Sequence, residues 1–365
     1  MAYTTIDDPS EFFNTILYTG DGNASGARSI TGVGFKPDWV WIKERDNTAY
    51  HNLFDSNRGV GKVLHTNATD AEGDYTSYFT AFGSDGFTLE NNPGSLNGNT
   101  DTYVAWNWKA NGGTTSSNSN GDITSTVQTN TTAGFSIVTY TGNGTSGATI
   151  GHGLNSAPEW TIIKRRSDTE AWPVWHTSFG SAQSNVRLNG TDAVDTSSSA
   201  MFNNTFPTSS LITLGNGNFV NTNTETYVAY CFSEVKGYSK FGSYTGNSNA
   251  DGTFVYTGFK PAWIMIKHTG SFGGDQQYAT WGIWDNKRAT SNVVTQATML
   301  TANTNYQEGN RGNNSSSTLD ALDMLSNGFK IRNSSYEVGQ SGTYIYMAFA
   351  EHPFVSSKGV PVTAR

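Results

Sequence analysis

The sequence has few of the residues on which several common classes of protein depend. A single cysteine, Cys231, is present in 365 residues, so no disulfide can form within the chain. Charged residues make up only 14%, and no run of lysine or arginine supplies the basic surface that nucleic-acid binding requires. No apolar stretch approaches the ~18 residues of a membrane-spanning helix. We therefore expect a protein that neither binds nucleic acid nor inserts into a membrane.

The start of the chain also lacks an export signal. The segment MAYTTIDDPSEFF contains no basic region followed by an apolar one, so we predict no signal peptide. An extracellular style of composition without such a signal is consistent with release by cell lysis, as virus particles are released. The net charge of -8 mainly favours solubility.

Catalytic and metal-binding motifs are missing too. The sequence has no nucleophile elbow, zinc-protease motif, phosphate-binding loop or dinucleotide fingerprint. The acidic turn over residues 70–74 could hold Ca²⁺ but does not follow the EF-hand pattern, so ordinary turn chemistry is the preferred interpretation. The histidines are scattered, with no pair spaced as ligands on one helix face: His51, His65, His152, His176, His268 and His352. We predict no enzyme, no cofactor and no metal site.

Aromatic and turn-forming residues are abundant. The chain has 10 Trp, 17 Tyr, 20 Phe and 40 Gly. Aromatic and β-branched residues interrupted by glycine, serine and asparagine are typical of many short strands joined by tight turns. No segment shows helical periodicity, so the sequence predicts an all-β protein of antiparallel sandwiches.

One stretch occurs three times. TYVAWNW at 102–108 returns as TYVAYCF at 226–232 and as TYIYMAF at 343–349, and each copy closes a unit that opens with Tyr-Thr-Gly at 18, 140 and 244. We predict three tandem modules with the following boundaries: an N-terminal arm over 1–13, module 1 over 14–109, a linker with a possible edge strand over 110–133, module 2 over 134–232, module 3 over 233–354 and a tail over 355–365. Composition favours a flexible coil at 110–120 and a long surface loop at 301–318.

Comparison of the three copies assigns roles within the repeated strand. Alternation puts Val104, Trp106 and Trp108 on one face, with large residues at the equivalent positions of the other copies. The opposite face is also largely apolar, which predicts a central strand covered on both sides. Cys231 occupies a slot that holds asparagine and alanine in the other copies, so we predict a packing residue and not a nucleophile.

A second recurring pair admits two interpretations. Lys43, Lys164 and Lys267 end equivalent strands, and each is followed by Asp55, His176 or Asp285. The pairs could form part of a binding site, but a strand-end ion pair worth at most about 1 kcal/mol is preferred, because module 2 replaces the acid with histidine.

The N-terminal arm also has two interpretations. Its acidic residues and the Phe12–Phe13 pair are typical of a polar arm that leads into the first strand. The alternative is a docking segment that inserts both rings into a partner.

Taken together, the motifs GFKPDWVWIK, LFDSNRG, SDGFTL, TYVAWNWKA, FSIVTYTGNGT, GHGLNSAP, KFGSYTGN and FVYTGFKPAWIMIK resemble a repeat family of marine bacteriophages, including phages of cyanobacteria. Those proteins are described as tail fibre-like or virion structural proteins. The resemblance implies β-sandwich modules of the jelly-roll or lectin-like kind displayed on a phage particle. It carries over no functional residues. The chain lacks the repetitive region of a long fibre shaft, so a compact head or knob is expected.

The expected function is a non-enzymatic structural protein of the phage tail or tail-fibre apparatus that contributes to host attachment. A capsid decoration protein and a polysaccharide-degrading tailspike enzyme are the alternatives. Expected partners are other virion proteins through the N-terminal arm, further copies of the chain in a homotrimer by analogy with fibres, and a host surface glycan.

Overall fold

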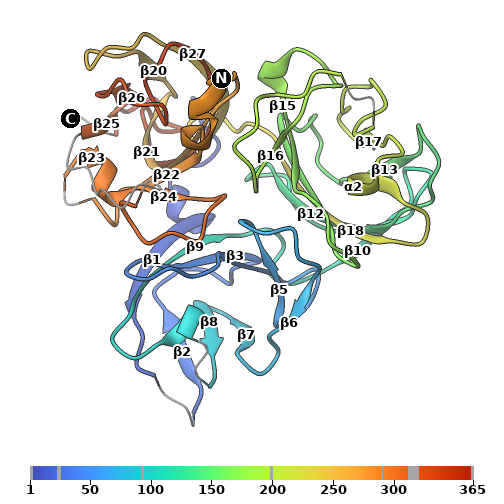
Figure 1. The fold of residues 1–365 in the computed structure, drawn as a ribbon. Coiled ribbons are helices and arrows are strands. Elements are labelled where there is room, and N and C mark those ends of the chain that lie inside the picture. Colours follow the sequence, from blue (N-terminus) through green and yellow to red (C-terminus); the bar gives the residue numbers. More distant parts are fainter. Residues whose placement is uncertain are drawn as a thin grey trace.

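A computed structural model describes residues 3–22, 26–91, 94–197, 200–289, 291–310 and 320–362. Within these residues nearly all regular structure is β, in six antiparallel sheets, which confirms the predicted all-β class. The sheets form three lobes around a common centre (Figure 1). Among the described residues, no helix has the length and apolar character that a membrane crossing requires.

The first lobe contains module 1. Its larger sheet has the order β1-β9-β3-β4-β5-β6 and its smaller sheet the order β2-β8-β7. The elements are η1 (Pro9–Glu11), β1 (Phe13–Thr19), β2 (Arg28–Thr31), β3 (Trp39–Glu44), β4 (Asn52–Asp55), β5 (Lys62–His65), β6 (Gly73–Asp74), β7 (Phe79–Gly83), β8 (Gly86–Leu89), α1 (Gly94–Asn97) and β9 (Thr102–Trp108).

The second lobe contains module 2. Its larger sheet has the order β10-β11-β12-β18-β14-β15-β16, and β13 pairs with β17. The elements are β10 (Ser116–Asn118), β11 (Ser125–Asn130), β12 (Phe135–Thr141), β13 (Thr149–Gly151), β14 (Trp160–Arg165), β15 (Pro173–His176), η2 (Thr177–Phe179), β16 (Val186–Arg187), β17 (Leu211–Thr213), α2 (Asn218–Asn221) and β18 (Thr226–Phe232).

The third lobe contains module 3. Its sheets have the orders β19-β27-β21-β22-β24 and β20-β26-β25-β23. The elements are β19 (Ser239–Gly246), β20 (Phe254–Tyr256), β21 (Phe259–His268), η3 (Gly273–Tyr278), β22 (Trp281–Asp285), β23 (Val293–Thr295), η4 (Gln296–Thr298), β24 (Leu300–Thr301), β25 (Asp320–Leu325), β26 (Gly328–Ile331) and β27 (Gly342–Pro353).

The three copies of the repeated strand are β9, β18 and β27, and each lies inside its larger sheet. One face of each strand packs against the smaller sheet of the same module. The other face, which carries Trp106, Tyr230 and Met347, packs into one core that all three modules share. The predicted two-sided burial of this strand is confirmed, and alternation of side chains along the strand explains it.

This shared core makes the three modules one packed unit. It contains fully buried tryptophans from every module, among them Trp39, Trp160 and Trp263. Rings from different modules touch directly: Trp108 meets Trp263 with centroids 5.5 Å apart, and Trp39 meets Tyr230 at 5.0 Å. The aromatic faces of the repeats therefore pack on one another.

The segment expected to be a flexible coil at 110–120 is anchored. The buried carboxylate of Asp38 accepts hydrogen bonds from the backbone N–H groups of Ala110, Gly112 and Gly113. Residues 116–118 then form β10, which pairs with β11 at the edge of the second sheet. Composition alone missed this because the anchor lies more than 70 positions earlier in the chain.

The N-terminal arm packs on its own chain. Phe13 and Ile6 are buried in the shared core, with exposed fractions of 3% and 2%. The Tyr3 hydroxyl donates to the carbonyl of Gly258 in module 3 at 2.8 Å. The apolar rings at positions 12 and 13 thus contact the third module, and the acidic residues Asp7 and Asp8 stay exposed.

Candidate functional site

Three equivalent loops, one from each module, meet at the centre of the molecule. They follow β5, β16 and β24, and each carries an asparagine whose Oδ1 accepts from a backbone N–H at the start of a neighbouring strand of the same module or one residue before it. The three bonds are each 2.9 Å long: His51 N to Asn67, Trp172 N to Asn189 and Trp281 N to Asn303. Each bond uses only the oxygen of the amide, so the three NH₂ groups remain donors for a ligand.

A polar depression of about 460 Å³ lies between these loops. Its lining is rich in amides and hydroxyls, with one carboxylate and two phenol rings: Tyr50, Asn67, Ala68, Thr69, Asp70, Asn189, Asn303, Thr304, Asn305 and Tyr306. Tyr50 is 46% exposed and stacks on His65 with ring centroids 4.8 Å apart. The arrangement presents fixed hydrogen-bond donors and acceptors beside an exposed aromatic ring.

Each loop is fixed by contacts with the next module. The indole of Trp172 in module 2 donates to the carbonyls of His65 and Ala68 in module 1, at 3.1 and 3.0 Å. The indole of Trp281 in module 3 donates to the Arg187 carbonyl in module 2 at 2.8 Å. Module 1 in turn contacts module 3, because Ala49 N donates to the Asn305 carbonyl in module 3 at 2.9 Å. Each pair of modules is thus joined at these loops. The three loops therefore hold the depression rigidly.

Two of the recurring lysines support these loops, and the predicted ion pairs do not form. Lys164 Nζ donates to the Thr69 carbonyl of module 1 at 3.0 Å, and Lys267 Nζ to the Asp192 carbonyl of module 2 at 3.1 Å. The prediction of a Lys43–Asp55 pair is wrong because Asp55 lies opposite Trp39, and four residues of a strand span about 13 Å. The Lys267–Asp285 prediction fails in the same way.

The ammonium groups are buried, and burial disfavours charge. Burial lowers the pKa of Lys267 to about 7 and the pKa of Lys43 and Lys164 to about 8. None of the three lines the depression. Lys164 and Lys267 serve the loops as hydrogen-bond donors beneath the surface, and Lys43 donates to the Asn47 carbonyl of its own module at 3.4 Å.

The recurring acids belong to buried networks that join modules. Asp55 accepts from the Arg58 guanidinium and, at 2.7 Å, from the hydroxyl of Tyr230 in module 2. Arg58 also reaches Glu72 at 3.0 Å, and Glu72 forms a bidentate pair with Arg166 of module 2 at 2.8 and 2.9 Å. We name these five residues the first network. It holds module 1 to module 2.

A second network of the same design holds module 3 to module 1. Asp285 accepts from Arg288 at 2.6 Å and from the indole of Trp106 at 2.9 Å. Glu308 lies 3.5 Å from Arg288 and also pairs with Arg45. The strand registers give Asp285 the position of Asp55, and Glu308 N donates to the Arg45 carbonyl at 2.7 Å as Glu72 N does to the Arg166 carbonyl.

The third interface, between modules 2 and 3, has the same positions without the charges. His176, Phe179, Val194, Thr269 and Met347 stand where the networks have acid, arginine, acid, arginine and aromatic donor. The backbone there is equivalent, because Val194 N donates to the Thr269 carbonyl at 2.8 Å as Glu72 N does to the Arg166 carbonyl. All five positions therefore differ from the two networks, with a mainly apolar set in place of the ionic one.

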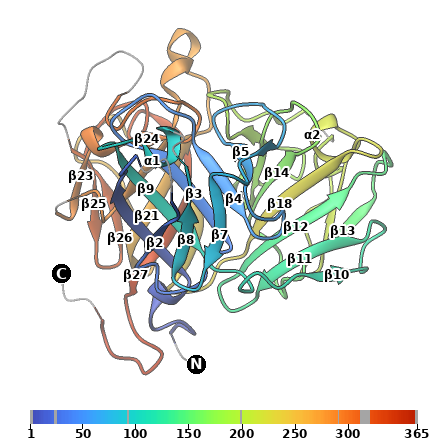
Figure 2. The same cartoon turned by 90° about the horizontal axis from the view of Figure 1, so that it is seen from below.

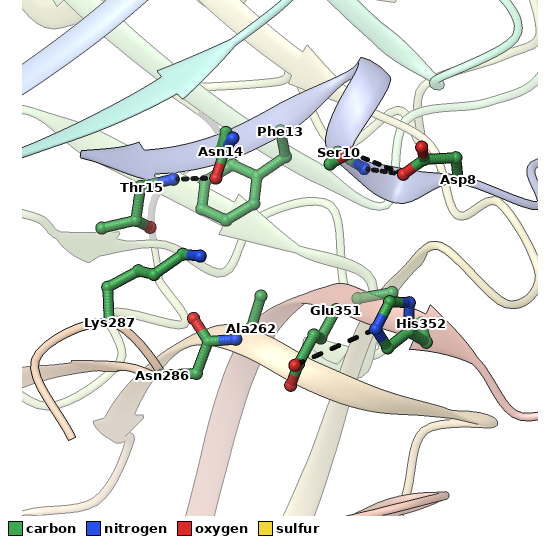
Figure 3. Close-up of a pocket in the computed structure, with 11 residues that line it drawn as sticks. Asp8, Ser10, Phe13, Asn14, Thr15, Ala262, Asn286, Lys287, Glu351 and His352 are labelled. Carbon is green, nitrogen blue, oxygen red and sulfur yellow. Dashed lines mark hydrogen bonds and ion pairs between the residues drawn. The ribbon is translucent and has the colours of Figure 1, made fainter. Parts of the chain in front are cut away.

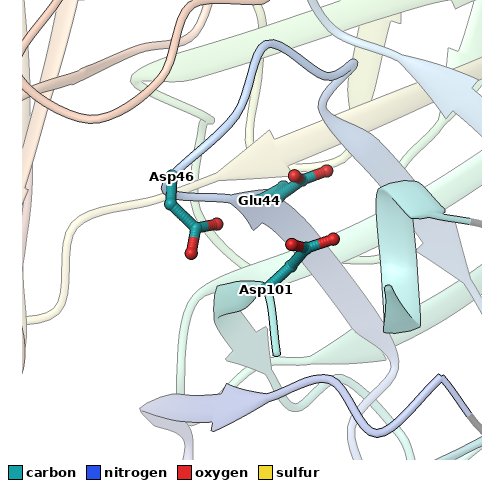
Figure 4. Close-up of side chains that lie close together, drawn as sticks. All are labelled: Glu44, Asp46 and Asp101. Atoms are coloured by element: carbon teal, nitrogen blue, oxygen red, sulfur yellow. The ribbon is translucent and has the colours of Figure 1, made fainter. Parts of the chain in front are cut away.

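The structure describes one group of acidic side chains close enough to share a cation (Figure 4). The carboxylates of Glu44, Asp46 and Asp101 approach within 4.8 Å of one another. Burial raises the pKa of Glu44. Asp46 already accepts from the backbone N–H of Thr102 at 3.0 Å. None of the three lines the central depression, and the predicted Asp70–Asp74 turn is not part of the group.

Cys231 lies where the sequence predicted a packing residue. Its side chain is fully buried among apolar neighbours of module 2, and burial raises the pKa of the thiol far above its usual value. The proposed surface loop at 301–318 lies partly outside the described residues. Its described part, 301–310, contributes Asn303 and Asn305 to the depression.

Sequence comparison missed the asparagines of the depression. A signal was present, because TNATD at 66–70, LNGTD at 188–192 and ANTN at 302–305 share an Asn followed by Thr within two residues. Each asparagine lies two residues after the strand that precedes its loop. The distance from the recurring Asp55, His176 and Asp285 differs, however, at 12, 13 and 18 residues, so the motifs recognised in the sequence do not align these loops.

The chain belongs to a family described as a domain of unknown function, DUF7483, whose model matches residues 8–353. The matched region contains all three lobes. No curated protein matches the sequence.

Proposed function

We propose that this member of the DUF7483 family is a non-enzymatic structural protein of a bacteriophage particle, placed in the tail or tail-fibre apparatus, where it helps to attach the particle to its host. The sequence motifs resemble those of phage tail fibre-like proteins. A lectin-like arrangement of sandwiches with a homotrimeric assembly is part of the proposal. The sequence resemblance supports the location in a virion, and the central depression supports the role in attachment.

The depression is suited to a hydroxyl-rich ligand such as a surface glycan. Side-chain amides both donate and accept hydrogen bonds, and tyrosine offers an apolar face next to a hydroxyl. Its position also fits attachment. Figure 2 shows the N-terminal and C-terminal segments at the lower end of the molecule, whereas β5 and β24, which lead into the lining loops, lie toward the upper end. One end is thus free for the host when the other is joined to the particle.

Replacing Tyr50 by alanine is expected to reduce glycan affinity at least tenfold while leaving the melting temperature within about 2 °C, because the ring is exposed and supports no core contact. A glycan array identifies the ligand, and calorimetry measures its affinity. Phe254→Ala is the matched control, since that ring is 44% exposed on β20 of module 3. Equal loss in both variants, or none in Tyr50→Ala, would refute binding at the depression.

Two alternatives are separated by other measurements. Immunogold labelling of particles is expected to mark the tail, and uniform labelling of the capsid would favour a decoration protein. The second alternative is a polysaccharide-degrading enzyme. It is supported by the close carboxylates of Glu44, Asp46 and Asp101 in module 1, since paired carboxylates perform that chemistry. A turnover assay on host polysaccharide is expected to show no products. Turnover that disappears in Glu44→Gln would establish the enzyme instead.

A further inference from the structure

Strand β1 is an outer strand of its sheet. It pairs with β9 on one side, and no described strand pairs with its other side. The bonds from Lys109 N to the Phe12 carbonyl and from Gly20 N to the Asp101 carbonyl show that even-numbered residues of β1 point their backbone groups at β9. The backbone groups of Phe13, Thr15 and Leu17 therefore point outward, where they can template another strand.

Module 2 shows what occupies this position when it is filled. There β11 pairs with β12, the counterpart of β1, and Gln128 lies opposite Ile137. Gln128 is fully buried, and its Oε1 accepts from Ser56 of module 1 at 2.9 Å. The adjacent Asn57 donates to the carbonyls of Thr126 and Ile137 at 3.1 and 3.0 Å. The added strand is thus held by its own sheet and by the neighbouring module.

The equivalent place beside β1 is a pocket of about 320 Å³ (Figure 3). Asn286 and Lys287 of module 3 stand where module 1 has Ser56 and Asn57, and they face β1 across the pocket. The N-terminal arm contributes Asp8 and Ser10 to the lining, and β27 contributes Glu351 and His352. The pocket therefore has the two walls that enclose β11 in module 2.

The pocket also has polar atoms that no described group satisfies. Thr15 occupies the position at which the other modules bury Ile137 and Phe241 in the shared core. It is only 3% exposed, and its Oγ1 has no hydrogen-bond partner among the described residues; the same holds for Asn286 Oδ1. Buried polar atoms without partners are costly, so a ligand that satisfies them gains affinity.

We propose that the outer edge of β1 binds an extended strand of a partner polypeptide, antiparallel to β1, as β11 binds β12. The residue opposite Thr15 takes the place of Gln128 and carries an amide or a carboxylate. Its side chain lies within the pocket, where Asn286 offers an amide and Lys287 a cation. On binding, the outward N–H of Thr15 exchanges its present acceptor, Asn14 Oδ1 at 3.0 Å, for a carbonyl of the new strand.

The test uses a labelled peptide with the sequence of residues 122–131, DITSTVQTNT, added to the full chain. Fluorescence polarisation is expected to show saturable binding, and hydrogen exchange is expected to slow at Thr15 and Leu17. Thr15→Phe, which copies the aromatic residue of module 3, should weaken binding at least tenfold without lowering the melting temperature, because the ring fills the pocket. No saturable binding at millimolar peptide would overturn the proposal.

A second variant removes an outward donor alone. Leu17→Pro deletes an N–H that β9 does not use, so folding is expected to persist while peptide binding falls at least tenfold. Ser243→Pro is the matched control, because Ser243 holds the equivalent outward position on β19. Loss of binding in Ser243→Pro but not in Leu17→Pro would show that the peptide binds at β19 and not at β1, and would refute the proposal. Glycan binding through Tyr50 is measured in a separate experiment, and its result does not depend on whether the peptide binds β1.

Discussion

Substituting Arg58 by methionine is expected to lower the free energy of unfolding by about 3–5 kcal/mol, because it leaves Asp55 and part of Glu72 buried without their cation. The guanidinium is fully buried and serves both acids of the first network. Chemical denaturation followed by tryptophan fluorescence measures the change. Arg187→Met is the matched control, since that side chain is 58% exposed and its nearest acid is 4.0 Å away, and it should cost less than about 0.5 kcal/mol.

The third interface supplies a sharper form of this experiment. The five substitutions Asp55→His, Arg58→Phe, Glu72→Val, Arg166→Thr and Tyr230→Met copy into the first network the set found between modules 2 and 3. Replacement of a whole buried ion network by packed apolar groups is often neutral or stabilising. The variant with all five substitutions should therefore recover most of the stability lost in Arg58→Met. If this variant is less stable than Arg58→Met, the interfaces are not equivalent.

The second large effect expected is a loss of stability in mild acid. Burial lowers the pKa of His152 and His268 to about 4 and the pKa of His176 to about 3; it also lowers the pKa of His51 and His65. The unfolded chain binds protons at these groups near pH 6.5, before the folded protein does. The contribution of these histidines to stability is therefore fully present above pH 6.5 and is lost as the pH drops toward 4, by an amount on the order of 5 kcal/mol when several groups act together.

Thermal melts between pH 4 and 7 measure this effect. His176→Asn retains an acceptor for the Ser178 N–H but cannot titrate in this range, so its melting temperature should depend less on pH than that of the native protein. His352→Gln is the control, because that side chain is exposed. Parallel pH profiles for the native protein and His176→Asn would contradict the assignment.

The alkaline side extends the same argument. The lowered pKa values of Lys43, Lys164 and Lys267 mean that the unfolded chain holds more protons than the folded one between about pH 7 and 10. Stability should continue to rise over this interval. Above pH 10 it should fall, because burial raises the pKa of Tyr140 and Tyr244, among others, and only the unfolded chain ionises there.

The strand faces were predictable from sequence because they depend on local periodicity. Alternation along residues 102–108 separates Trp106 from Tyr103, and the structure places these residues in different cores. A sandwich interior and a shared centre give the same apolar signal, so the sequence did not indicate that the aromatic face packs against other modules.

The networks and the depression depend on residues far apart in the chain. Asp55 lies 175 positions from Tyr230, and no local pattern reports that contact. The Asp-x-x-Arg spacing shared by modules 1 and 3 was a usable local sign, since these i,i+3 pairs recur there, whereas module 2 has His176 and Phe179 at the equivalent positions. The lysines give a competing pattern, because a lysine and an acid that occur in the same order in modules 1 and 3 suggest a pair even when they lie at opposite ends of adjacent strands.

The single core shared by three lobes has a consequence for synthesis on the ribosome. The centre-facing Trp108 of module 1 receives Trp263 as a neighbour only after 155 further residues have been made, and Phe349 only after 241. At translation rates of about 5–20 residues per second, the nascent chain exposes this apolar face for some tens of seconds. Chaperone supply and slow translation should therefore govern the yield of soluble protein more than they do for chains whose domains each enclose their own core.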